Sequence, residues 1–299
     1  MGSSDPRSIR GRQQSLIAAI IHLRLHFQVL LAPIFLWGLV LAGSRPDGRT
    51  WLVFIAYHVF LYGGATAFNS AYDRDQGPVG GLRHPPPVDP FLLPWSLGIL
   101  VFGLVLALAR PWTACLYFLI LLLALAYSHP SVRLKARPWA SLVTIAVGQG
   151  VLPFLAGWLA TPEPSTDWQL GVMAAVSAAF VAIAFYPLTQ LYQVEEDRQR
   201  GDRTVAVVLG IDASFALSSL LLVAAAASTV ATVERRFGVG EAVVVFIFYG
   251  GLFGAVQWWR RRFRHWDVLQ NFRAAMRFTL VGAAGFGMYL LAHLVLAYG

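Results

Sequence analysis

The chain is poor in the residues that mark soluble and secreted proteins. Only 13% of its 299 residues are charged, against about 25% in an ordinary soluble domain, and 57% are hydrophobic. Cys115 is the single cysteine, which excludes an intrachain disulfide and a CxxC metal site. Lys135 is the single lysine, so the net charge of +8 comes almost entirely from arginine. What remains is a series of long apolar runs separated by short segments that carry arginine.

The apolar runs have the length of membrane-spanning helices. A helix needs about 20 predominantly apolar residues to cross the hydrocarbon core of a bilayer. Nine segments are expected to do so, namely 15–43, 51–72, 91–109, 112–128, 139–160, 168–193, 211–232, 241–260 and 272–298. The segment 112–128 is short, which leaves a count of eight open. The sequence therefore predicts an all-α polytopic membrane protein.

The basic residues are distributed unequally over the two sides of this predicted bundle. With the N-terminus placed on one side, 18 of the 23 basic residues fall on that side and five on the other. Basic residues concentrate in the cytoplasmic loops of membrane proteins. We therefore expect a protein of a bacterial cytoplasmic membrane, with its N-terminus in the cytoplasm and its C-terminus on the opposite side. Because topology accounts for the positive charge, no nucleic-acid partner is expected.

A first polar cluster follows the second apolar segment, in the stretch FNSAYDRDQGPVGGLRHPPP. Asn69 and Asp73 are four residues apart and therefore share one face of a helix, with Asp75 just beyond it. Oxygen ligands of this kind suit Mg²⁺, which binds one or two carboxylates together with substrate phosphates. Arg74 would contact phosphate oxygens. An ordinary helix end is the alternative, but it leaves Asn69, inside the apolar segment, unexplained.

A second acidic cluster follows the sixth apolar segment, in QVEEDRQRGDRT. Gln193 and Asp197 again lie four residues apart, and Glu196 adds a carboxylate beside them. Crowded like charges are unfavourable unless a cation compensates them. A metal ion shared with the first cluster would do so, and neutralisation by the neighbouring arginines is the alternative. Both clusters fall on the expected cytoplasmic side and, with the loops around them, predict one polar site.

Three further basic residues lie near these clusters in the predicted topology. Arg133 and Lys135 belong to YSHPSVRLKARP after the fourth apolar segment, and Arg24 lies inside the first. A positive cytoplasmic loop explains Arg133 and Lys135 without any ligand. Arg24 has the alternative of extending its charged end to the membrane interface. Anion binding is the interpretation that applies if the acidic clusters hold a metal ion.

In combination these motifs resemble the UbiA superfamily of intramembrane prenyltransferases. The first motif of that family, NDxxDxxxD, is similar to NSAYDRDQG here, in which Asn69 and Asp73 keep their places. The basic YSxPxxRLK segment of the family is similar to YSHPSVRLK, and RQRGDRTVAVVLG resembles the end of its second motif. In that second motif Gln193 stands where an acid is usual, while Asp197 is retained.

The resemblance implies an architecture. Residues 1–299 would form one integral-membrane domain, with nine transmembrane helices around a central cavity that opens to the cytoplasmic side. Residues 1–14 are expected as a polar tail. Residues 73–90 and 194–210 are expected as the cytoplasmic loops that carry the two motifs.

The resemblance also implies a reaction, the Mg²⁺-dependent transfer of an isoprenoid group from a polyprenyl diphosphate to an aromatic or lipophilic acceptor. The residues implied for catalysis are Asn69, Asp73 and Asp197. Those implied as metal ligands are Asn69, Asp73, Asp75, Gln193, Glu196 and Asp197. Those implied for the diphosphate are Arg24, Arg74, Arg133 and Lys135. Membrane lipids are the remaining expected partners, and no obligatory protein partner is expected.

Two other functions stay open on the sequence. A terpene cyclase of the same fold would let the isoprenoid cation be attacked by its own chain. A transporter or lipid-binding protein would carry out no reaction at all. Transporters place their polar groups near the middle of the bilayer, whereas the acids here cluster at one side. That distribution favours the enzyme.

Overall fold

The computed structural model describes residues 6–298, with side chains described from Gln14 onward. Within that range the regular structure is helical, apart from one isolated bridge between Val79 and Leu82. Eight helical stretches are long and apolar enough to cross a membrane: Gln14–Ala42, Gly48–Asp73, Pro111–Ser128, Pro138–Leu159, Trp168–Arg200, Ile211–Phe237, Val239–His265 and Val268–Tyr298. They confirm the all-α membrane fold and match eight of the nine expected segments.

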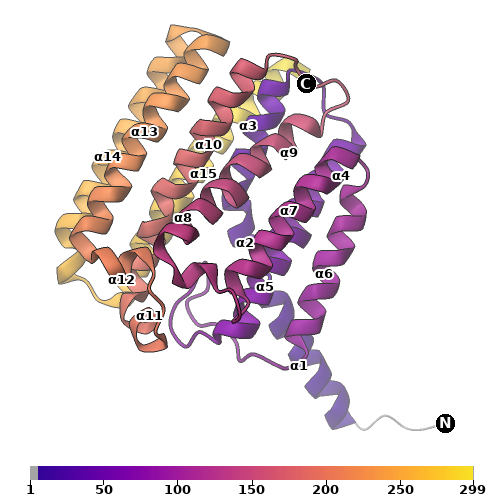
Figure 1. The fold of residues 1–299 in the computed structure, drawn as a ribbon, viewed down its shortest axis with the longest axis vertical. Helices are drawn as coiled ribbons and strands as arrows, with labels where there is room; N and C mark the ends of the chain where they lie inside the picture. The colour runs from indigo at the N-terminus through magenta and orange to yellow at the C-terminus, as the bar shows by residue number, and fades with distance from the viewer. Residues whose placement is uncertain (1–5, 299) are drawn as a thin grey trace.

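The ninth expected segment is the short helix α6 (Leu92–Ala107), which has 16 residues. It packs against the helices before and after it in the chain (Figure 1). The helix expected to be short, α7 (Pro111–Ser128), has 18 residues. Prolines set these limits, because Pro90 precedes α6 and Pro111 occupies the first turn of α7, where a missing N–H costs nothing.

Several of the spans are built from shorter helices. In the first half of the chain these are α1 (Pro6–His22), α2 (Leu25–Gln28), η1 (Val29–Leu31), α3 (Ala32–Ala42), α4 (Gly48–Ile55), η2 (Ala56–Leu61) and α5 (Tyr62–Asp73). The next are η3 (Leu134–Ala136), α8 (Pro138–Ile145), η4 (Ala146–Val151), α9 (Leu152–Leu159), α10 (Trp168–Gln190) and η5 (Leu191–Gln193). The last are α11 (Val194–Arg200), α12 (Val205–Leu209), α13 (Ile211–Phe237), α14 (Val239–Arg262), η6 (Phe263–His265) and α15 (Val268–Tyr298).

Two of these interruptions, η2 and η4, are π-helical turns inside membrane spans. Such turns widen a helix locally and are frequent near functional sites. The hydroxyl of Tyr62, which follows η2, donates to the carbonyl oxygen of Gly148 in η4 at 3.2 Å. The two widened turns are thereby joined beside the interior of the bundle.

The core forms where α3 and α9 cross. A Cβ atom on Gly38 would collide with the carbonyl oxygen of Phe154, and one on Gly157 with that of Phe35. Without side chains at these two positions the backbones touch, as small residues allow between membrane helices. Trp37 is fully buried beside this crossing. The crossing fixes the centre of the bundle, and Figure 1 shows α13 and α14 in a row outside α10.

Both acidic motifs lie at one end of the bundle. Figure 1 shows the start of α1, the connection after α5, and helices α11 and α12 at the lower end, whereas α15 finishes at the upper end. Residues 194–210, expected as a loop, instead contain α11 and α12. The expected polar tail is also partly helical, because α1 begins at Pro6; residues 1–5 lie outside the described part of the chain.

Candidate functional site

Four separate segments meet at the lower end of the bundle and surround one cavity. They are the end of α5, the basic loop around η3, the end of α10, and α11 with the turn that follows it. The cavity has a volume of about 360 Å³, inside the range of roughly 300–1,000 Å³ for small-molecule sites. Its polar end holds the predicted residues Asp73, Asp197 and Lys135.

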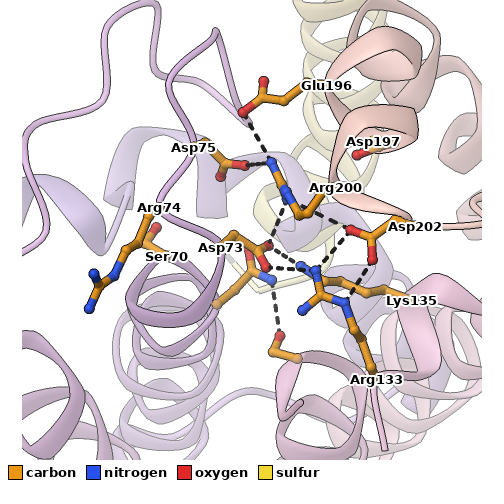
Figure 2. A network of polar contacts seen from close by, with 12 residues as sticks. Ser70, Asp73, Arg74, Asp75, Arg133, Lys135, Glu196, Asp197, Arg200 and Asp202 are labelled. Atoms are coloured by element: carbon orange, nitrogen blue, oxygen red, sulfur yellow. Dashed lines mark hydrogen bonds and ion pairs between the residues drawn. The ribbon is translucent and has the colours of Figure 1, made fainter.

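Asp73, the last residue of α5, lies at the centre of this polar end. Its Oδ2 atom accepts a hydrogen bond from Lys135 Nζ, and Arg200 Nη1 lies 3.7 Å away. Its Oδ1 atom lies 3.7 Å from Arg133 Nη2 and has no hydrogen-bond partner among the described residues. Asp73 thus has three cations around it and one buried oxygen still free to accept (Figure 2). Buried acceptors are nearly always satisfied in folded proteins, so this oxygen is a candidate ligand atom.

Arg200 connects the two acidic motifs. Its Nη2 atom lies 2.8 Å from Asp75 Oδ1 and 3.0 Å from Glu196 Oε1. Its Nη1 atom lies 3.9 Å from Asp202 Oδ2 and reaches Asp73 as well. The neutralising arginine expected as an alternative to a metal ion is therefore present. Arg200 donates no hydrogen bond to Asp73 Oδ1, so this oxygen remains available to a metal ion or another ligand.

Arg133 and Asp202 form a second, bidentate ion pair beside Asp73. Arg133 Nε and Nη2 donate to the two carboxylate oxygens of Asp202 at 2.7 and 2.9 Å. These hydrogen bonds, opposed by partial burial, raise the pKa of Arg133 above its usual value, so the guanidinium stays charged. Charge-assisted bidentate pairs are strong and fix the orientation of both groups. Arg133 is consequently held beside Asp73, although it is not among the residues that line the cavity.

The remaining predicted ligands lie around the same cavity. Asn69 donates from Nδ2 to Ser128 Oγ at 3.0 Å, which leaves its amide oxygen available. Asp197 is buried, and its Oδ2 accepts from Thr204 Oγ1 at 3.1 Å. Gln193 also lines the cavity, one turn before Asp197.

Arg24 is buried at the break between α1 and α2, and it also lines the cavity. It is only 4% exposed, and its Nη2 donates to Ser70 Oγ at 2.8 Å. Its Nε has no hydrogen-bond partner, and no carboxylate lies within 4.0 Å of it among the residues that the structure describes. An isolated buried guanidinium is costly, which makes Arg24 an anion-binding candidate.

Three non-glycine residues of the described chain have a positive φ angle, and all three are predicted diphosphate ligands. They are Arg24 at 51°, Arg74 at 51° and Arg133 at 45°. This left-handed backbone is unfavourable for a residue with a side chain and persists where surrounding structure enforces it, often at functional sites. In each case the turn sits where a helix begins or ends beside the cavity.

Three predicted residues are not among those that line the cavity, namely Arg74, Glu196 and Arg133, of which Arg133 lies beside Asp73. Arg74 caps the end of α5, is exposed, and points away from Asp73 in Figure 2. Glu196 faces Arg200 and accepts from the backbone N–H of Gln76 at 3.1 Å, so it secures the loop after α5. Both stay outside the set that lines the cavity.

Sequence reasoning considered Arg200 only as a neutralising charge, and it did not assign Asp202 or the tyrosine pair of the site. The hydroxyl groups of Tyr127 and Tyr186 lie 2.9 Å apart on the cavity wall. Asp202 was visible in the sequence as an acid within RGDRT, five residues after Asp197, yet its partner Arg133 is 69 residues away. Only folding makes that pair evident.

The donor set fits Mg²⁺ held jointly with a phosphorylated ligand. No group of three or more His, Cys, Asp or Glu side chains with metal-binding geometry occurs among the described residues. Mg²⁺ needs only one or two carboxylates when phosphate oxygens and water complete its shell. The free Oδ1 of Asp73 and the amide oxygen of Asn69 supply ligands of that type. A metal bound by protein side chains alone does not fit.

Beyond the polar end the cavity wall is apolar. It is formed by aliphatic and aromatic residues of α3, α10, α14 and α15, among them Ile34, Trp37, Phe185, Phe248 and Phe286. A ligand that fills this space needs an anionic head and a long apolar tail. The cavity wall around that tail offers few polar groups to which water could hydrogen-bond.

Comparisons with known proteins agree with this architecture. The model of the UbiA prenyltransferase family matches residues 31–281. Lycopene elongase/hydratase of Haloferax volcanii is 26% identical over 278 residues, which is 86% of this chain and 88% of that protein. Lycopene elongase/hydratase of Corynebacterium glutamicum is 25% identical over 224 residues, 72% of this chain and 77% of that protein.

Solved structures also match nearly the whole chain. A UbiA homologue from Archaeoglobus fulgidus, solved with GPP and Mg²⁺, has a TM-score of 0.70 at 18% identity and covers 93% of this chain and 99% of that one. A UbiA homologue from Aeropyrum pernix, solved without ligand, has a TM-score of 0.62 at 15% identity and covers 89% and 98%. At these identities the likeness establishes the fold.

Proposed function

Because the chain belongs to the UbiA prenyltransferase family, we propose that it transfers an isoprenoid group from an isoprenyl diphosphate to a lipophilic acceptor in the membrane, with Mg²⁺. The main support for this proposal is the structure of the cavity. At one end lie Asp73, with a free buried oxygen, and the isolated guanidinium of Arg24, and apolar walls continue from them. An isoprenyl diphosphate has this same division into a charged head and an apolar tail.

In the proposed reaction, the polar end binds the diphosphate. Arg24 and Lys135, which line the cavity, would neutralise its oxygens together with Arg133 beside Asp73. Asp73 and Asn69 would hold Mg²⁺ against the diphosphate, with Asp197 beside them. Mg²⁺, when bound, would stabilise the negative charge of the departing diphosphate. Arg200 would keep Asp73 and Asp75 of the first motif and Glu196 of the second in place, since it pairs with all three.

Bond cleavage would then occur at the boundary between the polar and apolar parts. The allylic C–O bond breaks, its electron pair leaves with the diphosphate, and the allyl cation remains in the apolar section. Aromatic faces such as those of Tyr62 and Phe185 can stabilise positive charge, and exclusion of water protects the cation. A carbon–carbon double bond of the acceptor attacks this cation, a new carbon–carbon bond forms, and the resulting cation loses a proton.

For the acceptor we propose an acyclic carotenoid. Two kinds of support favour it over an aromatic acid. The two relatives compared by sequence above are named lycopene elongase/hydratase, and the cavity wall beyond the polar end is apolar. The bias of arginines towards the end that holds Asp73 supports a cytoplasmic position for that end.

The test is a reaction of purified protein in detergent with dimethylallyl or geranyl diphosphate and lycopene. We expect diphosphate release with Mg²⁺ and its loss in EDTA, together with a carotenoid whose mass has increased by one isoprenoid group. Equal release in Mg²⁺ and EDTA contradicts the role of the metal. A cyclic hydrocarbon formed without lycopene identifies a cyclase instead, and substrate flux in proteoliposomes without any product identifies a transporter.

A further inference from the structure

A second hollow lies on the outside of the bundle, between α14 and α15, near the turn that joins them. Its volume is about 650 Å³. Its depth is lined by apolar residues, including Phe248, Leu252 and Phe278, and its mouth by Trp258, Trp266 and two arginines of α15. The turn lies at the lower end of Figure 1, the same end as α11 and α12.

The two arginines, Arg273 and Arg277, are one helical turn apart and face the same groove. Both are exposed, and no carboxylate lies within 4.0 Å of either in the described part of the chain. The nearest acid in the sequence, Asp267, accepts from the backbone N–H of Gln270 at 2.7 Å and caps α15. The groove therefore carries two positive charges that no carboxylate of the described chain balances.

Hydrogen bonds of a buried asparagine fix the turn beside the groove. Asn271, which is 4% exposed, accepts from Trp259 Nε1 at 2.9 Å and donates to the carbonyl oxygens of Phe263 and Trp266 at 3.1 and 3.2 Å. These bonds fix the turn, and with it the separation of α14 and α15. A Cβ atom on Gly251, in the groove wall, would meet nothing within 4 Å, so there is room for an inserted chain.

We propose that this groove binds an anionic phospholipid of the surrounding leaflet. The phosphate would lie between Arg273 and Arg277, the tryptophans would contact the glycerol region, and one acyl chain would occupy the apolar depth. Anionic lipids favour basic side chains at the cytoplasmic face, and tryptophan favours the interface. This proposal is independent of the isoprenoid reaction, because none of its charged residues lines the central cavity.

The bound acyl chain would lie against the reaction chamber. Phe248 and Leu252 line both the groove and the central cavity, so they form a shared wall. The lipid would thereby support that wall from outside.

The test is native mass spectrometry of delipidated protein titrated with phosphatidylglycerol or phosphatidylcholine of identical acyl chains. We expect the first phosphatidylglycerol to bind on the order of tenfold more tightly than phosphatidylcholine. The variant Arg273→Gln with Arg277→Gln should abolish that preference. Its matched control, Arg261→Gln with Arg264→Gln, removes the same charge at the same end but outside the groove and should keep it.

A preference that persists in the first variant overturns the proposal, and so does an equal loss in the control, which would indicate diffuse positive charge. Gly251→Leu gives an independent measurement that leaves both arginines in place. By filling the groove it should weaken the first bound phosphatidylglycerol by about tenfold. Unchanged binding of that lipid by a monodisperse Gly251→Leu protein also contradicts a groove-bound chain.

Discussion

The helical span from Gly48 to Asp73 has a carboxylate and an arginine at each end, but the two ends differ. At the start, Asp47 accepts from the backbone and side chain of Thr50 at 2.8 and 2.9 Å and pairs with Arg110 at 2.6 Å. Arg110 and Thr50 also donate to the carbonyl oxygen of Ala160. Both oxygens of Asp47 are in use, and its side chain is 41% exposed.

At the other end, Asp73 is 5% exposed and has one oxygen without a hydrogen bond. Its cations come from the basic loop and from α11, 60 or more residues away in the chain. The Asp47 end lines no part of the central cavity, whereas the Asp73 end does. A charged helix end therefore indicates a binding site only where folding leaves polar capacity unused beside a cavity.

The largest expected difference between the two ends is in the reaction. Asp73→Asn keeps the shape of the side chain but removes its negative charge. That charge balances the surrounding cations and would bind Mg²⁺. We expect diphosphate release to fall on the order of 10²-fold or more. The matched variant Asp47→Asn should stay within about twofold of the wild type, since no electrostatic contact links it to the cavity. Similar losses in both variants, measured in the same assay, would contradict the comparison.

A smaller difference is expected in substrate affinity. Arg200→Gln removes the group that joins Asp73, Asp75 and Glu196. Hydrogen bonds to charged groups contribute about 1.5–3 kcal/mol, so KM for the isoprenyl diphosphate should rise by roughly 10–100-fold. Arg110→Gln is the control at the other end and should leave KM unchanged. A rise of KM in the Arg110 variant, or no rise in the Arg200 variant, would contradict the proposed difference between the Asp47 end and the Asp73 end.

The smallest effect concerns the pH dependence of stability at the Asp47 end. Partial burial opposes ionisation of Asp47, but the hydrogen bonds from Thr50 and the ion pair with Arg110 outweigh it and lower its pKa. A lowered pKa contributes stability above the unfolded-state value, about 3.9, and that contribution disappears as the pH falls through the folded-state value.

Asparagine caps a helix about as well as aspartate, so Asp47→Asn removes only the charge and its pairing with Arg110. Because the side chain is 41% exposed, we expect a loss of about 0.5 kcal/mol at neutral pH, as for exposed ion pairs. The difference between variant and wild type should shrink on acidification, and thermal unfolding in detergent at pH 7 and pH 3 measures both. A constant difference across that range would show that the charge of Asp47 is not involved.

Spacing within a single segment predicted which residues lie near one another. Asn69 and Asp73 were paired because residues four apart share a helix face, and both line the cavity. The same reasoning placed Arg74 with them, but Arg74 occupies a left-handed turn that directs its side chain outward. A turn of this kind reverses side-chain direction between adjacent residues, and no sequence pattern specified it.

Residue spacing within one segment does not predict contacts between segments that are far apart in the chain. The pairing of Arg133 with Asp202, and of Arg24 with Ser70, joins residues 69 and 46 positions apart. Each depends on how the helix ends converge after the bundle has formed. The catalytic and ligand roles of the predicted residues stay predictions until the variants above are measured.

By itself, the sequence determined the membrane-spanning helices and the concentration of acids and arginines at one end of them. It could do so because hydrophobic length and charge are properties of short, continuous segments. Only the tertiary structure decided which of those charges neutralise one another and which remain free in the cavity. The reason is that Asp73 and Asp47 look alike in their own segments, and their difference arises from neighbours that the chain brings together from far away.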